Sequence, residues 1–325
     1  MLNLTDKIIA NANILELHYF LKNNLHTMDA IVENRCEYEV LAIIKEVADF
    51  YSLQVIIETE PTAEGGIRKW FKLVSKNENE TAGITTAIII TLITILLSTP
   101  LTKISEKLID KLFEDTELNE LEKEKLKLEI DKLKDEAKFR NSLIEDSNSI
   151  KKRRSNFYET LSREKKIDKI SFALTNSEKA NLQIEKVVGK DDFKKFILVS
   201  DDLEPIIMES AEIEIISPVL KKGKYKWMGY FSGEPIIFSM QSNEFKTLVQ
   251  NAEVEFKNGS SINCVLQIKR KINNEGVEKV VGYDVLVINH YFENDLPIET
   301  LEGRKRKQQK EADRNQIDLF GNSDN

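Results

Sequence analysis

The sequence is poor in the residues that carry most catalytic and metal chemistry. Its 325 residues include only two cysteines and three histidines. Cys36 and Cys264 lie far apart and form neither a CxxC motif nor a zinc-ligand spacing, so we expect two reduced thiols. The sequence contains no P-loop, GxGxxG, HExxH or GxSxG motif. We therefore expect a protein that is not an enzyme and that holds no cofactor and no metal ion.

A metal-dependent nuclease is the enzymatic alternative that the residues offer. Paired carboxylates beside a lysine can hold a divalent cation, and Glu58, Glu60 and Lys69 supply these groups. Their spacing fits such a site poorly, and a solvated hairpin face explains them more simply.

Positive charge is in the minority overall. The chain has 47 Lys and Arg against 55 Asp and Glu, which gives a formal net charge of −8. This balance argues against bulk coating of nucleic acid but permits a local basic patch. With 41% hydrophobic and 31% charged residues, the composition is not that of a multi-span transporter. The length allows two or three domains.

Charged side chains are absent from one long stretch, Thr81–Thr102, which reads TAGITTAIIITLITILLSTPLT. A helix of about 20 mostly apolar residues crosses a bilayer core. A strand of this length would far exceed the usual 5–6 residues or so. The run therefore predicts one transmembrane helix over residues 79–102. The alternative is a fully buried core helix.

Polar and small residues within this run fall on one side of the predicted helix, because they are spaced three and four residues apart. Such a face allows close helix packing or lines a pore after oligomerisation, whereas a plain anchor needs neither. The predicted pore-lining residues are Ala87, Thr91, Thr94, Ser98 and Thr102.

The fold class that the sequence predicts is multidomain α+β. Residues 1–78 read as a small α/β domain, with helices at Asn11–Asn23 and Met28–Tyr51 and strands at Gln54–Glu60 and Ile67–Val74. Residues 103–167 form a long, charged amphipathic helical region with a narrow apolar seam.

A basic run, Lys151–Arg154, lies within this helical region. Three roles stay open for it: a solvated helix end, a contact with anionic lipid headgroups, or a contact with a nucleic-acid backbone.

Residues 168–298 change from helical to alternating periodicity and predict a β-rich domain, either a barrel or a sandwich, with a short helix around Asn243–Gln250. The predicted strands are Lys169–Thr175, Phe196–Val199, Ala211–Ile216, Tyr225–Phe231, Ile236–Met240, Glu253–Phe256, Ile262–Lys269 and Tyr283–Ile288.

Two basic clusters in this domain suggest a ligand. Basic side chains beside aromatic rings can hold phosphates while bases stack, so the clusters favour a nucleotide or a single-stranded oligonucleotide. An ordinary sheet edge protected by lysines is the alternative. The candidate ligand-binding residues are Lys221, Lys222, Lys224, Lys226, Trp227, Tyr230, Lys269, Arg270 and Lys271.

The polar tail, residues 299–325, is expected to be disordered. Five of its residues resemble the short motif by which bacterial proteins bind the replication sliding clamp, with Gln first, an aliphatic residue second, Asp third and Leu-Phe last. The resemblance implies the sliding clamp as a partner. These residues are Gln316, Ile317, Asp318, Leu319 and Phe320.

The overall organisation resembles single-span membrane effectors of bacterial anti-phage defence, of the Hailong channel type. This resemblance implies a ligand-gated homo-oligomeric ion channel that is controlled by a nucleotide or oligonucleotide. We expect four subunits. Its location would be the bacterial inner membrane, with the soluble parts mainly cytoplasmic. The alternative is a membrane-anchored DNA- or replisome-binding adaptor without channel activity.

Overall fold

The computed structural model describes residues 13–25, 27–59, 67–76, 82–100, 144, 146–176, 185–221, 223–293 and 296–320. The chain divides into two compact units. Unit 1 comprises Met1–Ser200 together with Asn274–Val277, and unit 2 comprises Asp201–Asn273 and Glu278–Asn325.

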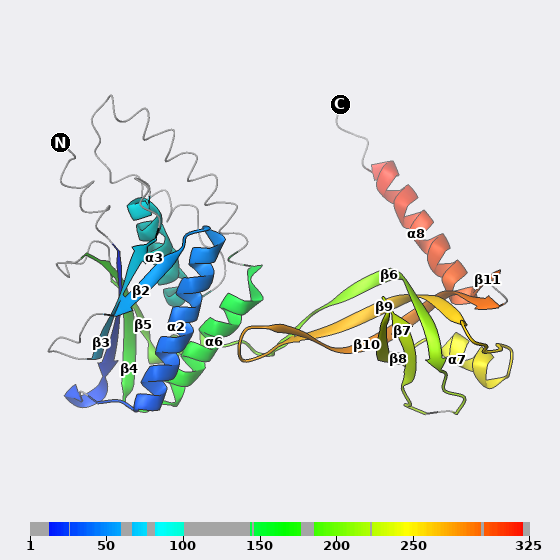
Figure 1. The fold of residues 1–325 in the computed structure, drawn as a ribbon, viewed down its shortest axis with the longest axis horizontal. Helices are drawn as coiled ribbons and strands as arrows, with labels where there is room; N and C mark the ends of the chain where they lie inside the picture. The colour runs from blue at the N-terminus through cyan, green and yellow to red at the C-terminus, as the bar shows by residue number, and fades with distance from the viewer. Residues whose placement is uncertain are drawn as a thin grey trace, which may run out of the picture. The chain divides into compact units, whose positions relative to one another are not determined.

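Unit 1 is built on a five-stranded antiparallel sheet with the order β2-β3-β1-β4-β5 (Figure 1). Alternate residues of the central strand, Leu15, Leu17 and Tyr19, belong to the hydrophobic core, as the period of two in a strand requires. The strands are β1 (Ile14–Leu21), β2 (Val55–Thr59), β3 (Ile67–Ser75), β4 (Ile167–Thr175) and β5 (Lys186–Gly189).

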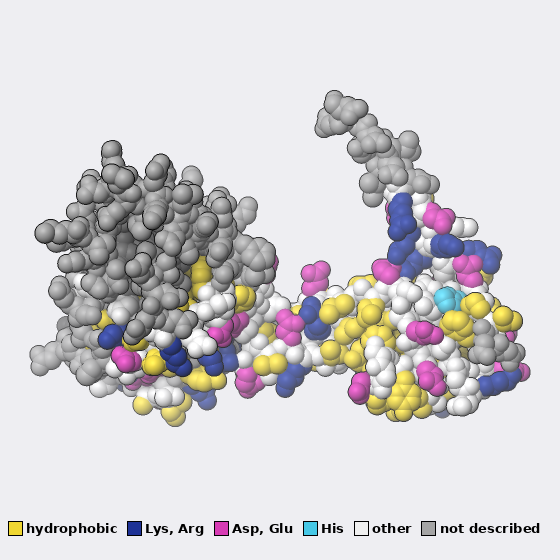
Figure 2. Space-filling model, turned by 45° about the horizontal axis from the view of Figure 1, so that its top comes forward, with side chains coloured by type: hydrophobic (Ala, Val, Ile, Leu, Met, Phe, Trp, Pro, Cys, Tyr) yellow, Lys and Arg dark blue, Asp and Glu magenta, His cyan; other side chains and the backbone are white. Residues whose placement is uncertain are grey.

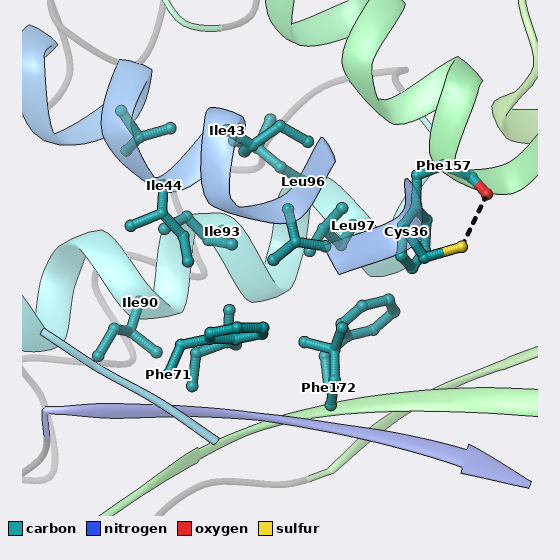
Figure 3. Close-up of a cluster of buried hydrophobic side chains, with 14 of the residues drawn as sticks. Cys36, Ile43, Ile44, Phe71, Ile90, Ile93, Leu96, Leu97, Phe157 and Phe172 are labelled. Atoms are coloured by element: carbon teal, nitrogen blue, oxygen red, sulfur yellow. Dashed lines mark hydrogen bonds between the residues drawn. The ribbon is translucent and has the colours of Figure 1, made fainter. Parts of the chain in front are cut away.

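Among the described residues, three α-helices cover one face of this sheet (Figures 1 and 3). The first begins after Asp29, whose carboxylate accepts hydrogen bonds from the backbone N–H groups of Ile31 and Val32 and so caps the helix. The helices are α2 (Ala30–Phe50), α3 (Ala82–Ser98) and α6 (Asn148–Arg163), and two short 3-10 helices are η1 (Lys22–Asn24) and η2 (Lys190–Phe196).

The uncharged helix α3 lies inside the core of unit 1. Figure 3 shows its Ile90 and Ile93 between Ile44 of α2 and Phe71 of the sheet. Every residue from Ile89 to Leu97 is buried. A helix that is apolar all round must be surrounded by apolar groups, whether of a membrane or of a protein core. Here the protein's own sheet and helices provide those surroundings.

Side chains from α6 satisfy the carboxyl end of α3. Arg154 donates to the carbonyls of Leu96 and Thr99, each at 3.2 Å, and the Tyr158 hydroxyl donates to the carbonyl of Leu97. The last carbonyls of a helix have no partner within the helix, and in a core they cannot turn to water. Burial lowers the pKa of the Arg154 guanidinium to about 10, so it still carries its charge at neutral pH.

The prediction of a transmembrane helix is wrong. Among the residues that the structure describes, no helix is long and apolar enough to cross a membrane. Helix α3 has 17 residues and ends two residues before Pro100, because a proline disfavours helical backbone in the residue before it. The predictions of a single-span α+β architecture, of a membrane protein and of an ion channel are therefore also wrong.

The described residues of the predicted pore-lining row lie within unit 1. Thr91 and Thr94 are buried in unit 1, and the Thr94 hydroxyl donates to the carbonyl of Ile90 at 2.9 Å, one turn earlier in the helix. Ser98 is half-buried. The side chain of Ala87 and the whole of Thr102 lie outside the described residues.

The last three residues of the basic run Lys151–Arg154 are also buried in unit 1. Arg153 forms an ion pair with Glu39 at 3.2 Å and donates to the carbonyl of Glu275 at 2.6 Å. Arg154 is 4% exposed and caps α3. These two arginines are neither at a solvated helix end nor available to lipid headgroups or a nucleic-acid backbone, because both are buried and hydrogen-bonded within unit 1.

Several local predictions for unit 1 are confirmed, and others are wrong. Helix α2 and strands β2 and β3 lie where the sequence placed them. Residues Asn11–Asn23 were predicted to be helical but contain β1, and Phe196 ends η2 rather than opening a strand. Residues 101–143 of the predicted amphipathic region lie outside the described part of the chain, and α6 confirms helix at its end.

Unit 2 is a closed five-stranded barrel with one added strand. The order is β10-β8-β7-β6-β9, and β9 pairs again with β10 to close the barrel. All pairings are antiparallel except that of β8 with β10, which is parallel. The strands are β6 (Asp202–Ser217), β7 (Trp227–Phe231), β8 (Glu234–Met240), β9 (Ser261–Ile272), β10 (Glu278–Glu293) and the added β11 (Leu296–Glu299).

Two helices belong to unit 2. Helix α7 (Asn243–Gln250) connects β8 to β9 and confirms the predicted short helix. Helix α8 (Leu301–Phe320) replaces the expected disorder over most of the tail. The polar composition of the tail predicted disorder. The first turn of α8 is nevertheless capped, because the Glu244 carboxylate accepts hydrogen bonds from the N–H groups of Leu301 and Glu302.

We predict that Arg154→Ala destabilises unit 1 on the order of 2–4 kcal/mol, because it removes the donor to the buried carbonyl of Leu96 in α3 and to the partly buried carbonyl of Thr99 just after the helix. Urea denaturation, with hydrogen exchange of the α3 amides as the local readout, measures the loss. The matched control is Arg163→Ala on the same helix: Arg163 is 66% exposed and pairs with Glu159 one turn away. Equal effects of the two substitutions would contradict the capping role.

Candidate ligand-binding groove of the barrel

A groove of about 360 Å³ opens between the β6–β7 connection and helix α7. Three of its lining side chains are lysines: Lys221 and Lys224 come from the connection, and Lys246 comes from α7. Its lining contains no carboxylate among the described residues. The other polar side chains that line it are Tyr225, Ser239, Gln241 and Gln250.

Local sequence positions both walls of the groove. In α7, Ser242 caps the first turn by accepting from the N–H of Phe245 at 3.0 Å. Phe245 and Val249 are buried, so the residues that follow each of them, Lys246 and Gln250, face the groove. In the opposite wall Gly223 lies against the ring of Tyr225, where an added Cβ would approach that ring to 2.7 Å.

The groove has a positive potential that the neighbouring protein does not neutralise. Within the described part of the chain, none of Lys221, Lys224 and Lys246 forms an ion pair, in contrast to most other cations of the barrel. Three ammonium groups in a groove without carboxylates attract an anion, and amide and hydroxyl groups can orient it. Phosphate esters are the anions that such lysines commonly bind.

An exposed apolar surface lies on the outer side of β7 and β8. Met228 and Ile237 are partners across these two strands, and Tyr230 pairs with Pro235. Tyr230 is 44% exposed. An exposed aromatic ring on this outer face is a surface on which a nucleobase can stack.

The structure separates the residues of the first predicted cluster. Lys221, Lys224 and Trp227 line the groove, Lys226 is exposed outside its lining, and Tyr230 lies on the outer face of β7. Lys222 lies outside the described residues. The lysine that the sequence analysis missed is Lys246, because twenty positions separate it from Lys226 and only the fold of α7 against the barrel brings it to the groove.

Trp227 is a core residue rather than a stacking surface. It is 1% exposed and lies among Phe238, Phe245 and Phe256, with ring centroids 6.1–6.3 Å away. Because its ring faces are covered by other rings, Trp227 shapes the floor of the groove and does not present a face to a base.

The second predicted cluster is neutralised by carboxylates. Lys269 pairs with Asp284 at 2.6 Å, and Lys271 pairs with Asp202 at 3.0 Å. Arg270 pairs with Glu278 at 2.7 Å. These residues lie on β9, away from the groove lining, and their charges stabilise the pairing of β9 with its neighbours.

The groups of the alternative nuclease site do not come together. Lys69 forms ion pairs with Glu33 and Glu37, whereas Glu58 pairs with Lys72. Glu60 lies outside the described residues. Over the ranges that the structure describes, no group of three His, Cys, Asp or Glu side chains is arranged to hold a metal ion.

The clamp-like motif occupies the end of α8. The backbone of Gln316–Phe320 is helical, while the side chains of these residues lie outside the described part of the structure. This placement keeps the motif at the far end of a helix that starts at the barrel.

The strand order and directions of unit 2 are those of the OB-fold, a five-stranded Greek-key barrel with a helix between its third and fourth strands. Barrels of this class bind oligonucleotides and oligosaccharides on the second and third strands and on two loops, which connect strands one to two and four to five. The first of these loops carries two of the three groove lysines, Lys221 and Lys224.

The second of these loops accepts hydrogen bonds from side chains of helix α6. Asn274–Val277, the tip between β9 and β10, is part of unit 1. Asn156 donates to the carbonyl of Asn274 at 2.9 Å, and Arg153 donates to that of Glu275. The backbone of the loop between β9 and β10 is therefore engaged within unit 1, while the loop between β6 and β7 carries Lys221 and Lys224 of the groove.

Comparison with known proteins found no matching family model, no matching curated protein and no matching solved structure.

We predict that Trp227→Ala destabilises the barrel by about 3–5 kcal/mol, because it removes the largest side chain of the core of unit 2. Tyr230→Ala, on the exposed face of the same strand, should cost about 1 kcal/mol or less. Urea denaturation followed by circular dichroism measures both. A fully stable Trp227→Ala variant would contradict the core position of this ring.

Proposed function

We propose that this protein binds single-stranded nucleic acid through the groove between the β6–β7 connection and α7. The observation that carries the proposal is a set of three lysines without a carboxylate partner among the described residues: Lys221 and Lys224 on the first loop of an OB-type barrel, and Lys246 on α7. The proposed ligand is of the class that basic side chains beside aromatic rings indicate in the sequence.

The physical argument has two parts. Lysine side chains that replace the condensed counterions of a phosphate backbone give affinity without sequence preference and make binding depend on salt. The exposed rings of Tyr225 and Tyr230 then offer faces for bases, and each base–aromatic stack contributes about 1–3 kcal/mol. Since the whole chain carries a net charge of −8, binding is confined to places where cations are locally in excess.

The broader role that fits this ligand is that of an adaptor at replicating or repaired DNA. Helix α8 begins at Leu301, fifteen residues before Gln316, so at ~1.5 Å per residue roughly 22 Å of helix separates the clamp-like motif from the barrel. A nucleic-acid module at one end and a clamp-binding motif at the other would join the two partners. Homo-oligomerisation and a role in anti-phage defence stay predictions.

We predict that Lys221→Glu/Lys224→Glu weakens binding of a labelled ~12-nucleotide single strand by about tenfold or more, since it reverses two charges of the groove. Fluorescence anisotropy over a salt series measures the affinity. The slope of log affinity against log salt should fall by ~0.7 for each lost phosphate contact.

The matched control for this variant is Lys257→Glu/Lys279→Glu. It makes the same change in net charge with two exposed lysines of the same unit that lie outside the groove lining. If both double variants weaken binding equally, the groove is not the site. If the unaltered protein binds no single strand at low salt, the proposed function is wrong.

We predict that Leu319→Ala/Phe320→Ala abolishes binding to a purified bacterial sliding clamp, because the two apolar side chains of the motif would fill the apolar pocket of the clamp. Surface plasmon resonance with immobilised clamp measures the complex. Asn322→Ala/Asn325→Ala, which changes the chain beyond the motif, is the control. Unchanged affinity of the Leu319→Ala/Phe320→Ala variant would reject the resemblance.

A further inference from the structure

Helix α8 is fastened firmly to the barrel at its first turn. The Glu244 carboxylate accepts from two of its N–H groups, and the Thr300 hydroxyl accepts from the N–H of Gly303 at 3.0 Å. The Glu302 carboxylate in turn accepts from the N–H of Ile288 at 2.8 Å. Gly303 lies so close to Asn289 that an added Cβ would come within 2.3 Å of its carbonyl oxygen. The direction of the helix is thus set by the barrel.

The first half of α8 carries a surplus of positive charge. The run Arg304–Lys310 contains five cations and no acidic residue, and Figure 2 shows these Lys and Arg side chains gathered along the helix. Arg306 and Lys310 share a single carboxylate, that of Glu209, and Arg304 pairs with Glu299 at 3.2 Å. Three of the five cations are therefore paired, and they share two carboxylates.

The remaining cations lie on the open sides of the helix. Gly303, Arg306 and Lys310 are spaced three and four apart and face the barrel. Lys305 and Lys307 are exposed, and within the described residues neither forms an ion pair. Gln308 is exposed between them on the far side of the helix. A helix with cations and amides on its free sides has the side chains that read and hold duplex DNA.

We propose that α8 binds in the major groove of double-stranded DNA. A helix with its side chains is about 10–12 Å across, and the major groove of B-form DNA is ~12 Å wide. The major groove of an RNA duplex is too narrow for a helix, so the geometry favours DNA. The surplus charge matches the phosphates on the two walls of the groove.

The two sites together define the substrate as a duplex that continues as a single strand. The single-stranded part of this inference rests on the proposed function. Helix α7 connects the two sites, because Lys246 and Gln250 line the barrel groove while Glu244 of the same helix holds the start of α8. With the duplex on α8 and the single strand in the groove, one molecule covers the junction between them.

Anisotropy measurements with a blunt DNA duplex, a single strand and a duplex with a single-stranded tail test the inference on the full-length protein. The tailed duplex should bind tightest. Lys305→Glu/Lys307→Glu should weaken binding to both duplexes by about tenfold or more and leave the single strand within about twofold. Lys257→Glu/Lys279→Glu again serves as the charge-matched control, and circular dichroism confirms that each variant folds.

The groove variant Lys221→Glu/Lys224→Glu distinguishes the two proposals, because it should weaken the single strand and leave the blunt duplex unchanged. If the unaltered protein binds the blunt duplex but no single strand, the groove proposal fails while the role of α8 stands. If Lys305→Glu/Lys307→Glu leaves duplex affinity unchanged, α8 is only a solvated arm and the inference is overturned. Equal affinity for an RNA duplex would also overturn the placement in a major groove.

Discussion

The capping of α3 by α6 is the interaction on which unit 1 depends. An uncharged helix can be buried on all sides only if its terminal carbonyls find donors, because an unpaired buried carbonyl costs about 1–3 kcal/mol. Arg154 and Tyr158 supply those donors from a helix that begins fifty residues after α3 ends. Once α3 is satisfied, its apolar surface fills the space between α2 and the sheet.

Cations that are already paired within the protein, as Arg154 is, cannot bind an external ligand. This explains why the basic clusters of the chain differ in what they can bind. Arg153 and Arg154 act inside unit 1, and Lys269, Arg270 and Lys271 pair with carboxylates across strands. Only where cations exceed their partners does a surface remain for an external anion. The groove lysines and the first half of α8 meet that condition, which is why both proposals concern nucleic acid and both concern unit 2.

Local patterns predicted elements well where one period dominated. The apolar spacing of α2 and the Asn243–Gln250 helix were confirmed, as were most strands of the barrel. The errors arose where two interpretations shared one pattern. Residues 14–21 alternate, with Leu15, Leu17 and Tyr19 buried on one face, yet their composition also suits a helix. The uncharged run suited a membrane and a protein core equally, and Pro100 was the local signal of a shorter helix.

The sequence by itself determined that an apolar helix lies within residues 79–102, that β-strands separated by turns follow within residues 168–298, and that lysines precede Trp227. These follow from side-chain periodicity and chain geometry, which are local. Only the tertiary structure decided where the helix is buried, that β4 joins β1 across a long separation, and that Lys246 comes to the groove while Trp227 lies in the core. The physical reason is that a side chain is buried, paired or free according to its neighbours in space, and those neighbours lie far away in the sequence.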